Sequence, residues 1–181
     1  MYVPDSIRSP QPALPGKLAR RDYEYKRCGT ANVFCGVEPK AGRHFLKATP
    51  TRSAAEFADY LMEILARYRE ARTIHLVMDN LNTHGAKALK DRYGERLGGL
   101  LWKCFTVHYT PKHGSWLNQA EIEVSLLSRQ CLARRRIPSL KTLAKQVDAH
   151  SRRLNHDQIT IDWKFTRKQA RQKLHYSSTL T

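Results

Sequence analysis

Long apolar runs are missing from this sequence: none approaches the ~20 consecutive residues that a membrane-spanning helix requires. The first residues also lack the apolar core of a secretory signal peptide. The four cysteines form no C-x-x-C pair and show no zinc-ligand spacing. No Gly-rich phosphate loop and no strained Ser or Cys elbow occurs, which argues against P-loop enzymes and hydrolase triads. We therefore expect a cytoplasmic protein whose thiols are reduced.

Negative charge is scarce as well. Sixteen Asp and Glu face thirty-two Lys and Arg, which leaves a formal net charge of +16. Such an excess repels itself within a folded protein, and a bound polyanion relieves the repulsion. We expect DNA or RNA as the partner. The alternative is a soluble protein that is merely basic.

The first half of the 181-residue chain divides into an arm, two strands and a helix. Residues 1–21 contain four prolines and no apolar period, which predicts an extended arm. Residues 22–38 are rich in Tyr, Val, Phe and Thr and are typical of a strand, and a turn at 39–42 leads to a second strand at 44–49. A capping-box pattern then opens a helix over 53–68.

The second half alternates between strands and helices. The spacing of apolar residues predicts, in order, a buried strand at 74–78, a helix at 86–97, a strand at 105–109, a helix at 118–134, a helix from 138 to about 154, and a short helix in the tail at 162–174. Two antiparallel strands followed by helix-separated strands indicate a mixed α/β sheet flanked by helices. This order fits a ribonuclease H-like domain over 22–156 if one more, central strand precedes residue 22, with a basic tail at 157–181.

Asp79 is the first candidate for chemistry. It follows a buried strand, and ligand sites of open α/β sheets lie beyond the carboxyl ends of strands. A carboxylate there suits a hard divalent cation, which prefers oxygen ligands. The alternative is an Asx turn that ends the strand.

Glu121 is the second candidate, at the start of a predicted helix that follows a loop. The alternative reading is a capping box, because Asn118 and Glu121 hold the N-cap and N3 positions. Glu123 lies about 200° further round the helix and cannot share the direction of Glu121, so we expect a solvated or supporting acid there. Lys112 and His113, in the preceding loop, could meet phosphate.

Basic side chains are concentrated in the last third of the chain. The run Arg134, Arg135 and Arg136 stands out, and we favour contact with phosphate over an ordinary solvated face because the whole chain is so basic. Such contacts would fix the register of a nucleic acid without reading its sequence.

Several segments resemble one known family. These are VMDNLNTH at 77–84, HYTPKHGSWLNQAEIE at 108–123, LSRQCL at 127–132, DYEY at 22–25, GTAN at 29–32 and WKFT at 163–166. Together they resemble the DDE-type, mariner-like transposases of the bacterial insertion sequence 630 group, over essentially the whole chain. The two longest segments match those that carry the second and third catalytic acids of the family.

The resemblance implies a ribonuclease H-like catalytic domain in which three carboxylates hold two Mg²⁺ or Mn²⁺ ions. Asp79 matches the second acid and Glu121 the third. The family cuts transposon ends with water and then joins the freed 3′-hydroxyl to target DNA, acting as a dimer. The matched segments imply DNA contacts by Lys112, His113, Arg129, Arg134, Arg135 and Arg136, and supporting roles for Asn80, Asn82, His84 and Trp116.

The family's first catalytic Asp lies on a strand upstream of the segment that matches residues 8–16. Asp5 and Asp22 do not occupy the position of that motif. From the resemblance we therefore expect an N-terminally truncated fragment with two of the three acids, weak binding of metal, and no transposition by the fragment alone.

Overall fold

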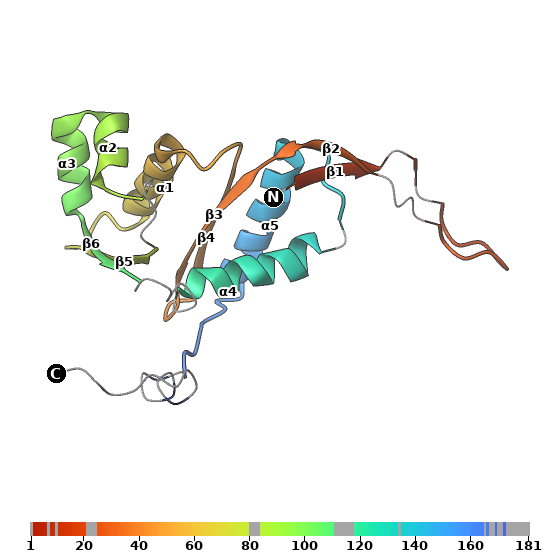
Figure 1. Cartoon of the computed structure of the whole chain (residues 1–181). Helices are drawn as coiled ribbons and strands as arrows, with labels where there is room; N and C mark the ends of the chain where they lie inside the picture. The colour runs from red at the N-terminus through yellow and green to blue at the C-terminus, as the bar shows by residue number, and fades with distance from the viewer. Residues whose placement is uncertain are drawn as a thin grey trace.

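The computed structural model describes residues 2–6, 8–9, 11–20, 25–79, 84–110, 118–133, 135–164, 166, 169 and 172, without the side chains of residues 2–6 and 25–28. Its elements are β1 (Tyr2–Ser6), β2 (Tyr25–Thr30), β3 (Asn32–Glu38), β4 (Arg43–Thr49), α1 (Ala54–Arg67), β5 (Ile74–Met78), α2 (Ala86–Tyr93), α3 (Glu95–Lys103), β6 (Phe105–Tyr109), α4 (Gln119–Leu126), the π-helix η2 (Leu127–Leu132) and α5 (Leu140–His156). The predicted mixed α/β class is confirmed (Figure 1).

The N-terminal segment that we assigned to an extended arm contains strand β1, which pairs antiparallel with β2. Two isolated bridges, Gln11 with Arg20 and Leu14 with Lys17, form a smaller hairpin between these strands. In Figure 1 this part of the chain projects from one side of the body.

The single strand predicted over 22–38 is wrong, because β2 and β3 are separate strands with different partners. The buried Ala31 separates the two strands. Near the end of β2, Gly29 adopts a φ of 135°, a conformation that glycine reaches without strain. β3 pairs antiparallel with β4, in a register that runs from Asn32 opposite Thr49 to Glu38 opposite Arg43. This β3–β4 hairpin is the centre of the molecule.

The elements from α1 to β6 form one half of the body. Helix α1 begins with the predicted capping box, in which the side chains of Ser53 and Glu56 each bond the backbone of the other. β5 and β6 pair in parallel, as expected of strands joined by helices. The single helix predicted over 86–97 is wrong: Gly94, with a φ of 86°, separates α2 from α3.

Helix α4 continues into the π-helix η2, and α5 begins where the sequence predicted, with Ser139 as its N-cap, whose side chain accepts from the Thr142 amide. The apolar spacing of the helix predicted over 118–134 comes from Ile122, Val124, Leu126, Leu127 and Cys131, and the burial it predicts is partly wrong. Leu127 and Cys131, which lie in η2, are buried as expected, but Ile122 and Val124 of α4 are 39% and 46% exposed.

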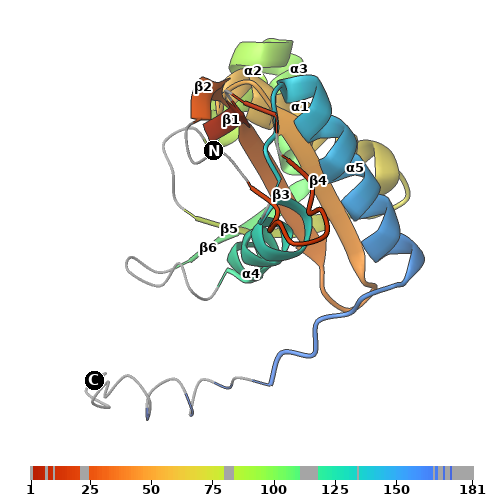
Figure 2. The ribbon, with the colours of Figure 1, turned by 90° about the vertical axis from the view of Figure 1, so that its right-hand side faces the viewer.

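Two apolar cores lie on opposite faces of the β3–β4 hairpin. Phe34 and Phe45 pack with α1, α2 and the β5–β6 pair, whereas Val33, Cys35 and Leu46 pack with η2 and α5. Alternate residues of a strand point to opposite faces, so the two faces take different partners. Figures 1 and 2 show the hairpin between these layers. No helix of the described residues is long and apolar enough to cross a membrane.

Candidate active site

Asp79 directly follows β5 and is held by a histidine. Its Oδ1 lies 2.9 Å from Nδ1 of His84, and the Asp79 side chain keeps 39% of its surface exposed. The ring of His84 stacks on Phe57 of α1, with 4.3 Å between ring centroids. This packing fixes His84, which in turn orients one carboxylate oxygen of Asp79.

Glu121 lies in the first turn of α4 and is exposed. The helix is capped by Asn118, whose side-chain oxygen accepts from the Ala120 amide at 3.1 Å. The reciprocal bond of a capping box, from Glu121 back to the Asn118 amide, does not form. Within the described part of the chain, the Glu121 carboxylate has no hydrogen bond or ion pair, so its oxygens remain open to a cation.

Asp79 and Glu121 line the same cleft, which has a volume of about 610 Å³. Its walls are β3, β5, the inner face of α1 and the start of α4, and His84 and Asn118 also line it. Among the described strands β3 pairs only with β4 and β5 only with β6, so both strands turn an unpaired edge toward this space. The structure thus brings together the two acids that lie far apart in the sequence.

Of the two alternatives expected for Glu123, a solvated or a supporting acid, the solvated one is wrong. Glu123 is 3% exposed and its Oε2 lies 2.9 Å from Nδ1 of His44, which is 1% exposed. The other ring nitrogen, Nε2, donates to the carbonyl of Ile159 at 3.0 Å, since a carbonyl can only accept. The contact between His44 and Glu123 therefore needs one further proton, on Nδ1 of His44 or on Oε2 of Glu123. The bond ties α4 to β4 in the interior of the protein.

The His44 backbone is bound on its outer side by α5. Its amide donates to Oδ1 of Asn155 at 2.7 Å, and its carbonyl accepts from the Asn155 amide at 3.0 Å and from the Ser151 hydroxyl at 3.1 Å. His44 therefore joins β4, α4, α5 and the segment after α5. Because Glu121 lies two residues from Glu123, this network sets the position from which Glu121 faces the cleft.

Cys35 of β3 also lines the cleft. Burial and, to a smaller extent, the nearby charge of Glu123 raise the pKa of its thiol to about 12. The thiol therefore stays protonated at neutral pH, and since thiolate is the reactive form, Cys35 is a packing residue of the cleft wall.

Only part of the predicted DNA-contacting set can be placed. Lys112, His113 and Arg134 lie outside the described residues, as do Asn80, Asn82 and Trp116. Arg129 is exposed on η2, Arg135 bonds Gln146 of α5, and Arg136 follows it. None of these three arginines is among the residues that line the cleft.

The donors of the cleft fit a divalent cation only in part. Two carboxylates on one cleft, one of them without a partner among the described residues, are the oxygen ligands that Mg²⁺ and Mn²⁺ prefer. Within the described ranges, however, no group of three or more His, Cys, Asp and Glu side chains is arranged to hold a metal. Asp79 and Glu121 would hold an ion together with water or a further donor.

His44 was not predicted from the sequence, although its partner left a signal. Glu123 lies four residues before Leu127 and eight before Cys131, on the stripe that packs into the core. A carboxylate on a buried stripe needs a buried partner, because an isolated buried charge is very costly. The identity of that partner, 79 residues away, needed the structure.

The comparisons with known proteins agree with this architecture. The sequence matches the family model described as DDE superfamily endonuclease over residues 3–144, a range that includes both Asp79 and Glu121. No curated protein and no solved structure matches the chain. The mixed α/β fold is consistent with a ribonuclease H-like domain of this family.

Proposed function

Since this chain belongs to the DDE superfamily of endonucleases, we propose that it is the catalytic domain of a transposase of the mariner-like insertion sequence 630 group. DNA is its substrate, and phosphoryl transfer is its reaction. The observation that supports the proposal best is the shared cleft, in which Asp79 and Glu121 face one space from two separate elements.

Asp79 and Glu121 are the proposed ligands of Mg²⁺ or Mn²⁺. A bound divalent ion would stabilise the charge that develops on the phosphodiester oxygens during cleavage. His84 orients Asp79 by the bond to Oδ1, and Glu123 positions α4 through His44. Lys112, His113, Arg129 and the arginines at 134–136 are proposed to contact the DNA backbone, and the full-length family acts as a dimer.

We further propose that the two carboxylates alone bind a single ion weakly and do not sustain cleavage. Family members use three acids, and no third acid joins Asp79 and Glu121 among the described residues. The alternative function, a basic nucleic-acid-binding module without catalysis, rests on the net charge of +16 and needs no metal at all.

Thermal unfolding with Mn²⁺ separates these functions. If the Kd is ~1 mM, 10 mM Mn²⁺ stabilises the fold by about 1.4 kcal/mol, which raises Tm by roughly 3–6 °C. We expect this shift in the wild type, and its loss in Asp79→Asn and in Glu121→Gln. Glu95→Gln, an exposed acid of α3, should retain it. Equal shifts in all four proteins would refute the site, and no shift in the wild type would favour the non-catalytic module.

A further inference from the structure

A second hollow lies at the turn of the β3–β4 hairpin, away from the candidate active site. We call it the hairpin-tip hollow; it has a volume of about 780 Å³ and lies between the turn, the end of α1 and the segment that follows α5. Its cationic and aromatic lining residues are Lys40, Arg43, Arg67, Phe45 and Tyr68, and Gln158 and Thr160 add neutral polar groups.

The charge of this hollow is poorly balanced. Three cationic side chains line it, and no carboxylate does. The carboxylate of Glu38 bonds two of the lining residues: it accepts from the Tyr68 hydroxyl and pairs with Arg43 at 3.4 Å. Among the described residues Lys40 and Arg67 have no carboxylate partner, unlike Arg92, which is bound by both oxygens of Asp59. Such an accumulation of positive charge is favourable when an anion is bound.

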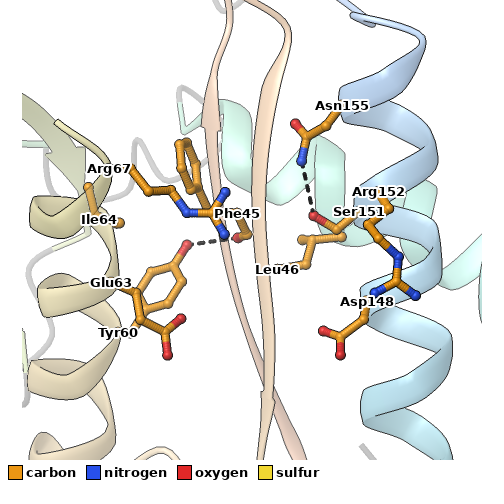
Figure 3. A pocket seen from close by; sticks show the side chains of 10 residues that line it. All are labelled: Phe45, Leu46, Tyr60, Glu63, Ile64, Arg67, Asp148, Ser151, Arg152 and Asn155. Carbon is orange, nitrogen blue, oxygen red and sulfur yellow. Dashed lines mark hydrogen bonds between the residues drawn. The ribbon is translucent and has the colours of Figure 1, made fainter.

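Two guanidinium groups of the hollow lie over aromatic rings. The guanidinium carbon of Arg43 is 5.7 Å from the ring centroid of Tyr68, and that of Arg67 is 5.3 Å from the ring centroid of Phe45. Figure 3 shows Arg67 reaching from α1 toward Phe45 on β4. An arginine that stacks on a ring keeps the N–H groups at its edge for phosphate, and less side-chain entropy is lost when the phosphate binds.

The backbone under these side chains is held firmly. Gly42 adopts a φ of 61°, and a Cβ at this position would come within 2.6 Å of the Gln158 backbone, so only glycine allows this close approach. The Ile161 amide also donates to the Pro39 carbonyl at 2.9 Å. The hairpin turn and the segment after α5 are therefore fastened to each other, which fixes the shape of the hollow.

The hollow lies at the end of the molecule where α4 begins. In Figures 1 and 2 the β3–β4 turn is at the same end of the body as the start of α4. His44, the neighbour of Arg43, bonds Glu123, two residues after Glu121. A DNA duplex that presents a phosphate to the cleft would therefore have adjacent backbone near the hollow.

We propose that the hairpin-tip hollow binds phosphates of the DNA backbone beside the segment that enters the cleft. The proposal rests on DNA being the substrate, as proposed above. The contacts read no sequence, because they are made to phosphate oxygens; they position the duplex relative to Asp79 and Glu121.

The test is binding of the purified chain to a fluorescent 30-base-pair duplex in EDTA, by anisotropy, over a series of salt concentrations. The hollow variant is Lys40→Gln with Arg67→Gln, and the matched control is Arg96→Gln with Lys103→Gln, which removes the same charge from the exposed face of α3. Each lost phosphate contact lowers the slope of log K against log salt by about 0.9. We expect the hollow variant to lose ~1.8 in slope and ~60-fold in affinity at 0.1 M salt.

The control variant should lose less than about threefold, since its charges lie far from the bound backbone and are screened. Equal losses in the two variants, with DNA binding by the wild type, would overturn the hollow and leave the proposed function standing. A wild type that shows no salt-dependent binding would overturn both. Equal Tm values for the two variants show that neither loss reflects unfolding.

Discussion

The buried pair of His44 and Glu123 leads to a sharp prediction of stability. Glu123→Ala removes a carboxylate that is 3% exposed and leaves the imidazole of His44, 1% exposed, without its partner on Nδ1. Losing one member of such a pair costs about 3–5 kcal/mol. Because a domain is stable by only ~5–15 kcal/mol, this change should remove about a fifth or more of the total stability.

Glu121→Ala is the matched control, two positions earlier on the same helix. Glu121 is exposed and, within the described residues, makes no hydrogen bond or ion pair, so we expect its loss to change the free energy of unfolding by at most about 0.5 kcal/mol. The two variants should therefore respond oppositely in two assays: Glu123→Ala should lower the stability, and Glu121→Ala should abolish the shift with Mn²⁺.

Urea unfolding followed by circular dichroism measures the effect. With a slope of ~2 kcal/mol per molar urea, Glu123→Ala should lower the midpoint by roughly 1.5–2.5 M. Replacing both partners, His44→Leu with Glu123→Leu, leaves mainly the Ile159 carbonyl without a hydrogen-bond donor, which costs about 1–3 kcal/mol of stability. The double variant should therefore be less destabilised than Glu123→Ala alone. A loss below about 1 kcal/mol in Glu123→Ala, or a double variant as unstable as the sum of the single ones, would refute the reasoning.

Three further predictions concern packing, pH and thiol reactivity. Gly98→Ala would place a Cβ 2.4 Å from the Leu89 carbonyl oxygen and should destabilise by about 1–3 kcal/mol in urea unfolding, whereas Gly99→Ala meets nothing closer than 3.9 Å and should stabilise by about 0.5–1 kcal/mol. Burial, together with the positive charges of Arg153 and His44, lowers the pKa of His150, so the unfolded chain binds this proton more readily. Stability should therefore fall as the pH drops from about 6.5 to the lowered pKa. The urea midpoints measured at pH 7.5 and pH 5.5 should differ less in His150→Gln than in the wild type. In a Cys28→Ser background, the exposed Cys104 should react with Ellman's reagent at pH 8 while the protein is folded. Cys35 and Cys131, whose pKa values are raised, should react only after unfolding. Three thiols that react at the same rate would contradict this.

Elements with strong local signals were predicted correctly. The Ser53–Glu56 capping box set the start of α1, the apolar run at 74–78 became β5, and Ser139 capped α5. Each of these signals comes from residues that interact within one or two turns or along one short strand, so they can be recognised without knowing the rest of the fold. The burial predicted for the strand at 74–78 is wrong, because Val77 is 55% exposed and His75 is also exposed.

The errors arose where tertiary contacts decide. The division of 86–97 depends on one positive φ at Gly94, and the division of 22–38 on two different pairing partners. The choice between a solvated and a supporting Glu123 stayed open because its partner, His44, lies on a strand far away in the sequence. Spacing alone also gave no reason for Asp79 and Glu121 to meet; the resemblance to a family suggested it, and the two residues line one cleft. Their role as metal ligands stays a prediction.

The amide of Asn155 has a consequence for how the protein behaves at high concentration. The Asn155 side chain donates to the carbonyl of His44 and accepts from the His44 amide, as a neighbouring strand would. It therefore occupies both backbone groups of His44 on the outer edge of β4. An unsatisfied border of this kind recruits strands from other copies of a protein. One side chain of α5 thus blocks strand pairing at the end of β4 beside the hairpin turn, and Asn155→Ala should favour assembly of copies along β4.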